Sequence, residues 1–100
     1  MKHVVMSVFD KKADAFIRPF LVPTVRVGAR AFQSIILDST SDLHQFPDDY
    51  NLMELGTFDD NSGVYENLKH PKFIANGSSF ARVVVVDAGR DNSMGGKDAS

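Results

Sequence analysis

Two segments near the start of the chain are rich in β-branched and aromatic residues, which is the pattern of β-strands. The first segment covers residues 3–9, where valines and a phenylalanine favour extended backbone, and a polar turn follows at residues 10–14. The second segment covers residues 15–22, and its Pro19 cannot donate a ladder hydrogen bond, which places this strand at a sheet edge or a bulge. Strict alternation puts four side chains on one face of the second strand: Phe16, Arg18, Phe20 and Val22.

A helical period replaces the alternation after Pro23. Thr24 is suited to cap a helix that ends near Leu37, and Gly28 weakens that helix by about 1 kcal/mol relative to alanine, which indicates close packing. Arg26 and Arg30 fall on a more polar face of the same helix. The apolar stripe that defines the helix consists of Val25, Ala29, Phe32 and Ile36.

The middle of the chain predicts a polar loop followed by a β-hairpin. Residues 38–49 form the loop, with Leu43 and Phe46 as its expected anchors to the core. Strand character returns at residues 50–58, and the sequence DDNSG at 59–63 contains residues that tolerate turns. The expected hairpin partner is the segment 64–68.

Short extended segments and a polar tail complete the pattern. Residues 72–75 predict another extended piece, and NGSS at 76–79 predicts a turn. Four consecutive valines favour a strand over a helix at residues 80–86. The tail at 87–100 has almost no core-forming residue, and we expect it to be disordered.

The order of elements predicts the α+β class. We expect a small antiparallel sheet of about five strands, with one helix that follows the second strand and packs across a face. Residues 1–86 are expected to form a single domain. A five-stranded barrel of the nucleic-acid-binding kind is a second topology, which the early position of the helix disfavours.

Charge is unevenly distributed, although its net value is only −2. Residues 1–37 carry six basic and two acidic side chains, a local charge of +4. Residues 38–68 carry eight acidic side chains and no lysine or arginine. Such asymmetry permits a basic binding surface on an acidic protein, and it is equally compatible with ordinary solvated faces.

Residues suited to catalysis or metal binding are sparse. The absence of cysteine excludes disulfides, thiolate nucleophiles and Cys-based zinc sites. His3, His44 and His70 lack the spacing of a helical metal site, and no glutamate closes a calcium loop after residues 59–63. The sequence also shows neither the features of a signal peptide nor a membrane span of about 20 apolar residues. We therefore expect a protein that is not an enzyme, needs no metal or cofactor, makes no membrane contact and acts by binding.

The second strand and the helix combine aromatic and cationic side chains. Proteins that bind single-stranded nucleic acid use aromatic rings to stack bases and nearby cations to hold phosphates. The alternative is that Phe16 and Phe20 form the core face of their strand. On the first interpretation, seven residues are predicted to contact nucleic acid: Lys11, Lys12, Phe16, Arg18, Phe20, Arg26 and Arg30.

Three segments carry distinctive motifs: MSVFDKKADAFIRPFLVPT (6–24), VRVGARAF (25–32) and FPDDYNLMELGTFDDNSGVY (46–65). They resemble the small non-structural proteins of gokushoviruses, tailless icosahedral bacteriophages with single-stranded DNA genomes. The third segment, with its acidic-aromatic loop and its Asp-Asp…Gly turn, is the most specific. The resemblance implies a replication accessory protein in the host cytoplasm with phage DNA as its ligand. It assigns no contact residue.

Two functions of different kinds follow from these observations. The first is binding of single-stranded DNA during genome replication or packaging. The second is a protein–protein adaptor, in which the acidic segment 38–68 contacts a basic replication or capsid protein. Mimicry of DNA by the same acidic segment is a third, weaker alternative. A homodimer through the edge strand that carries Pro19 is compatible with each function.

Overall fold

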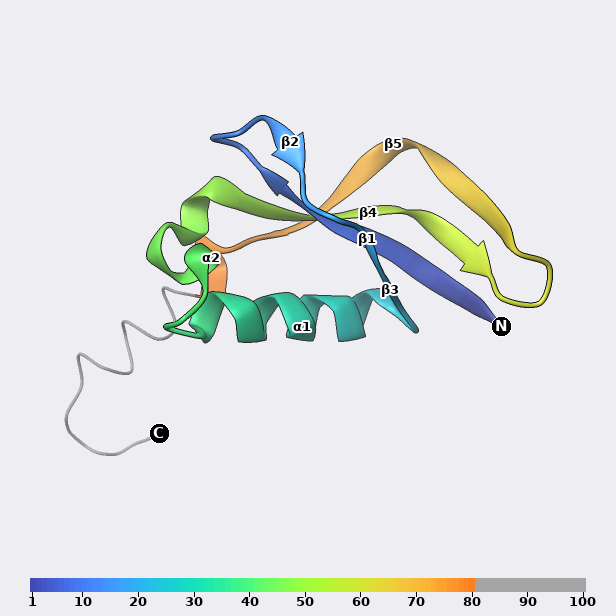
Figure 1. The fold of residues 1–100 in the computed structure, drawn as a ribbon, viewed down its shortest axis with the longest axis horizontal. Coiled ribbons are helices and arrows are strands. Elements are labelled where there is room, and N and C mark those ends of the chain that lie inside the picture. Colours follow the sequence, from blue (N-terminus) through green and yellow to red (C-terminus); the bar gives the residue numbers. More distant parts are fainter. Residues whose placement is uncertain (81–100) are drawn as a thin grey trace.

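A five-stranded antiparallel sheet with one main helix on one of its faces forms the fold, as the sequence predicts (Figure 1). The computed structural model describes residues 1–80 of the chain. The predicted strand beyond Phe80 and the predicted tail at 87–100 lie outside the described residues. In chain order the elements are β1 (Lys2–Asp10), β2 (Ala15–Phe16), β3 (Phe20–Val22), α1 (Val25–Leu37), α2 (Asp42–Gln45), the 3-10 helix η1 (Pro47–Asp49), β4 (Tyr50–Asp59) and β5 (Val64–Asn76).

Strand β1 organises the sheet. The strand order is β2-β1-β4-β5, and β3 pairs with the half of β1 that β2 leaves free. Strands β2 and β3 therefore share one edge of β1, and β4 occupies the other edge along its full length. Every pairing is antiparallel.

The hydrophobic core lies between the sheet and α1. Met6 and Val8 of β1 and Leu52 of β4 point to the helix side, where they meet Phe32 and Ile36. Phe32 is 1% exposed, which makes it a central core side chain. Because successive side chains of a strand point to opposite faces, the intervening residues of β1 face away from α1.

Helix α1 has the predicted boundaries, and its local chemistry explains both its start and its packing. The Thr24 side chain accepts a hydrogen bond of 3.2 Å from the backbone N–H of Val27, so one of the unpaired donors at the helix N-terminus is satisfied. Gly28 is buried, and a Cβ at this position would overlap the Met6 side chain. The close packing that the glycine indicated is therefore confirmed.

Strand β5 is one continuous strand, whereas the sequence predicts two separate extended pieces at 64–68 and 72–75. A pronounced bend explains the difference. Between the pairs Glu54–Lys72 and Gly56–Asn67, one residue of β4 lies opposite four residues of β5. The long strand bends outward there, as Figure 1 shows.

The segment between α1 and β4 is more ordered than the predicted polar loop, because it contains α2 and η1. Leu43 packs against the core as predicted. Phe46 does not, because its side chain is 61% exposed. This residue lies at the junction of the two short helices, and the aromatic residue of this region that packs against the core is Tyr50.

Candidate nucleic-acid interface

The turn between β1 and β2 holds two lysines in solvent. One carboxylate oxygen of Asp10 accepts hydrogen bonds from the backbone N–H groups of Lys12 (3.0 Å) and Ala13 (3.2 Å). Asp14 takes the left-handed conformation that closes the turn, with φ of 56°. The backbone N–H of Lys11 also donates to the carbonyl of Asp49 at 2.9 Å. The turn is thus fixed at several points, and both lysine side chains remain exposed.

An aromatic pair lies at the base of this turn. Phe9 and Phe16 are direct partners across β1 and β2, and their ring centroids are 4.9 Å apart at an interplanar angle of 56°. Phe9 belongs to the face of β1 that points away from α1, so Phe16 belongs to that face as well. Phe16 remains 46% exposed.

The predicted second strand is interrupted by one extra residue. Phe9 pairs with Phe16 and Met6 with Phe20, so two residues of β1 lie opposite the three residues Ile17–Pro19. The Ser7 hydroxyl donates to the Ile17 carbonyl inside this bulge. The prediction that Pro19 marks an edge or a bulge is confirmed.

This extra residue corrects the predicted common face of Phe16 and Phe20. A shift of one residue turns every later side chain to the opposite face of a sheet. Phe20 accordingly partners Met6 on the helix side and packs against the core, whereas Phe16 faces outward. Arg18 lies within the bulge and is exposed.

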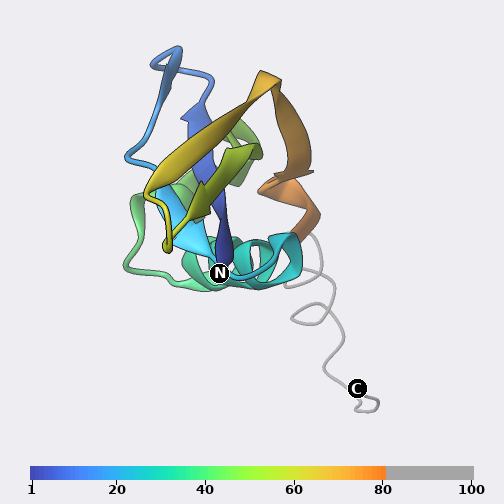
Figure 2. The same cartoon turned by 90° about the vertical axis from the view of Figure 1, so that its right-hand side faces the viewer.

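The cations predicted to form one surface lie in two places. Arg26 and Arg30 are exposed on α1. Figures 1 and 2 show α1 below the sheet and the β1–β2 turn above it, so the helix arginines are not adjacent to Lys11 and Lys12. Within residues 1–80, seven lysine and arginine side chains have no carboxylate within 4.0 Å, and the five cations predicted to contact nucleic acid are among them: Lys11, Lys12, Arg18, Arg26 and Arg30.

Further apolar side chains share the outward face of Phe16. We call this surface the open face and define it by six residues: Phe9, Phe16, Met53, Phe58, Tyr65 and Phe73. Phe58 and Tyr65 are direct partners, with ring centroids 4.6 Å apart. Sequence reasoning missed them as site residues, although two aromatic residues close to either end of the turn at 59–63 could have indicated the pair.

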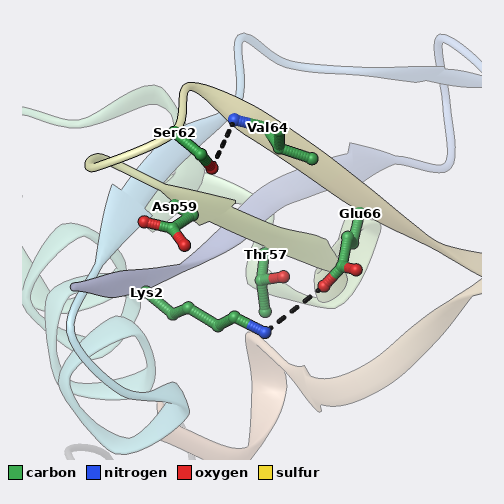
Figure 3. Close-up of a pocket in the computed structure, with 6 residues that line it drawn as sticks. All are labelled: Lys2, Thr57, Asp59, Ser62, Val64 and Glu66. Atoms are coloured by element: carbon green, nitrogen blue, oxygen red, sulfur yellow. Dashed lines mark hydrogen bonds and ion pairs between the residues drawn. The ribbon is translucent and has the colours of Figure 1, made fainter.

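A small polar pocket lies on the other face of the β4–β5 hairpin (Figure 3). It encloses about 190 Å³, and the Lys2 ammonium crosses it to Glu66 at 3.4 Å. The lining residues are Lys2, Thr57, Asp59, Ser62, Val64 and Glu66. Nowhere in residues 1–80 do three potential metal ligands come together. The part of the chain that the structure describes also contains no helix of the length and apolarity that a membrane crossing requires.

Comparison with known proteins gives one match. No curated protein and no solved structure is similar to the chain. The sequence model of the family described as Phage ORF5 protein matches residues 3–80, which covers every strand and helix described above apart from the first residue of β1. A match over this much of the chain establishes membership, and the protein therefore belongs to the Phage ORF5 protein family.

Proposed function

We propose that this phage protein binds single-stranded DNA at the β1–β2 end of its open face. The observation that carries the proposal is the exposed ring of Phe16, supported from behind by Phe9 and placed beside a turn that presents two lysines. Phe9 and Phe16 do not belong to the hydrophobic core cluster, which lies between the sheet and α1.

The aromatic pair supplies the part of the interaction that distinguishes single strands. An unpaired base can stack on an exposed ring, and such stacking contributes about 1 to 3 kcal/mol per base with little sequence preference. Bases inside a duplex are already stacked and paired, so a flat aromatic platform gains much less from them. Phe9 fixes the orientation of Phe16, which reduces the entropy lost when a base binds.

The cations supply the part that recognises the phosphate backbone. Lys11, Lys12 and Arg18 flank Phe16 in sequence, and none of them has a carboxylate partner among residues 1–80. Each phosphate contact releases condensed counterions, with a salt slope of about −0.7 per contact for single strands. Three contacts therefore predict that log K falls with log salt concentration with a slope of about −2.

Titration of labelled single-stranded and double-stranded DNA at low and moderate salt tests this function. We expect the single strand to bind more tightly, and Lys11→Glu/Lys12→Glu to weaken binding of all sequences alike. Arg26→Glu/Arg30→Glu is the matched comparison, since it removes the same charge from α1. Absence of single-strand binding at low salt rejects the proposal. An equal loss of affinity in the folded Arg26→Glu/Arg30→Glu variant also rejects it.

The second candidate is a protein–protein adaptor, which the exposed Phe46 favours. This ring stands between Asp42 and Asp48 in a segment without lysine or arginine, a combination suited to a basic partner with an apolar pocket. Co-expression with the basic capsid or replication proteins of the same phage tests it. Recovery of a complex that Phe46→Ala abolishes supports the adaptor, and no complex with either protein rejects it.

A further inference from the structure

A second aromatic pair lies on the open face, at the end opposite Phe16. Phe58 of β4 and Tyr65 of β5 have ring centroids 4.6 Å apart and an interplanar angle of 39°. Tyr65 is 60% exposed, more than Phe16. Since Phe58 partners His3 and the side chains of β1 alternate, this pair faces the same side as Phe9.

The strand register gives the spacing of the two pairs. Phe58 is the direct partner of His3 on β1. The other aromatic pair includes Phe9, which lies six residues further along β1. At about 3.4 Å per residue along β1, and with two strand spacings of about 4.8 Å across the sheet, the pairs are separated by about 22 Å.

Phe73 lies between the two pairs and is 55% exposed. Phe73 is the direct partner of Met53, and Met53 is the direct partner of Ser7. Ser7 lies two residues from Phe9 on β1. Three exposed rings therefore lie on one face of the sheet, Phe16 on β2 and the other two on β5.

The acidic residue next to the Tyr65 end of the open face is paired with positively charged or hydrogen-bonding groups, which weakens its repulsion of a polyanion. Asp60 follows Phe58 closely, but one of its carboxylate oxygens accepts from the Met1 ammonium at 2.7 Å and the other contacts the His3 ring at 2.8 Å. Lys69 is exposed in the bend of β5 and has no carboxylate within 4.0 Å among the described residues. Large exposed apolar surfaces of this kind mark binding sites rather than folding contacts.

We propose that Phe58 and Tyr65 form a second stacking platform, and that one single strand of DNA crosses the sheet obliquely from Phe16 on β2, past Phe73, to Tyr65 on β5. This inference rests on the proposed function and extends it to a ligand of defined length. At the rise of about 3.4 Å per nucleotide of a stacked strand, a span of about 22 Å corresponds to about seven nucleotides, and fewer in an extended strand.

A length series of oligothymidines with the full chain tests the second platform. Anisotropy titrations from about three to about twelve nucleotides cover the site sizes of comparable binding folds. The parent is expected to bind much more tightly once the strand reaches both platforms. Tyr65→Ala is expected to lose at least about fivefold in affinity for the long strands, with affinity for the shortest within about twofold of the parent.

Two further variants separate stacking from an unrelated structural effect. Tyr65→Phe keeps the ring and is expected to keep the length dependence. Val64→Ala changes the neighbouring residue, which is also exposed but faces the other side of β5, and is expected to bind as the parent does.

The outcomes distinguish this inference from the function on which it rests. A parent that binds no strand of any length contradicts the proposed function itself. Binding without a length step, or an unchanged step in Tyr65→Ala, leaves DNA binding intact and overturns the second platform. Burial of Tyr65 between two copies of the chain, seen as dissociation of a dimer in Tyr65→Ala, also overturns it.

Discussion

Phe16 and Phe20 lie on opposite faces of the same sheet, although only three residues separate them. The bulge at Ile17–Pro19 adds one residue relative to β1, so Phe16 partners Phe9 on the open face and Phe20 partners Met6 on the helix side. One ring is thereby available for a ligand, and the other contributes to the core.

The two phenylalanines are accordingly expected to respond differently to truncation. Phe20→Ala is expected to destabilise the fold by about 2 kcal/mol, below the values of about 3 to 5 kcal/mol for fully buried rings, because Phe20 is only half-buried. Phe16→Ala is expected to change the free energy of unfolding by less than about 1 kcal/mol. Urea denaturation of both variants measures the difference, and the reverse order of effects contradicts the assigned faces.

Phe32 provides the strongest test of the core. It is 1% exposed and packs edge-on against Phe80, with ring centroids 6.0 Å apart. Phe32→Ala is expected to cost about 3 to 5 kcal/mol, a large part of the total stability of about 5 to 15 kcal/mol that small domains have. Denaturant unfolding measures this change. A decrease in the free energy of unfolding below about 1 kcal/mol would contradict the packing of Phe32 between α1 and the sheet.

Gly28 and Met6 are expected to be energetically coupled. Alanine improves helix propensity by about 1 kcal/mol, but its Cβ would overlap the Met6 side chain, and overpacking of this kind costs about 1 to 3 kcal/mol. We expect Gly28→Ala to be destabilising in the parent and close to neutral in a Met6→Ala background. A double-mutant cycle gives the coupling energy, and additive effects would contradict the contact.

Asp60 is expected to make stability depend on pH in the acidic range. The hydrogen bond from the Met1 ammonium, together with the His3 ring, lowers the pKa of Asp60 below its ordinary value of 3.8. A carboxyl whose pKa is lower in the folded state stabilises the fold above pH 3.8, and this contribution is lost as the pH falls through the lowered pKa.

Thermal unfolding of the parent and of Asp60→Asn between about pH 6 and about pH 2.5 measures this contribution. The parent is expected to be the more stable protein at the upper end, and the difference is expected to decrease as the pH falls below 3.8. A difference that stays constant over the whole range would show that the charge of Asp60 has no role.

Local patterns in the sequence predict those elements that depend only on neighbouring residues. The cap at Thr24 and the apolar stripe of α1 fix that helix without reference to the rest of the chain, and the turn at 59–63 fixes the hairpin. The bulge at Ile17–Pro19 depends on pairing with β1, and the bend of β5 depends on pairing with β4. Such offsets follow from contacts between strands, which a single sequence does not display.

The candidate site was predictable only in part for the same reason. The turn that carries Lys11 and Lys12 follows from local turn residues. The outward position of Phe16 follows from its pairing with Phe9, and the sequence left open whether Phe16 faces the core. The prediction that Phe16 and Phe20 share a face was wrong, because one extra residue at Ile17–Pro19 turns Phe20 to the opposite face of the sheet. Arg26 and Arg30 were grouped with the strand by sequence proximity, whereas α1 carries them to the other side of the sheet.

The open face as a single-strand platform is tested most directly by one comparison: the affinity of the parent and of Phe16→Ala for the same labelled single-stranded DNA, measured at low salt. Loss of one stacked base of about 1 to 3 kcal/mol predicts a decrease of about 5-fold to about 150-fold for Phe16→Ala, with an unchanged salt slope because no phosphate contact is lost. Equal affinity of the two folded proteins, or no binding by the parent, would contradict the account.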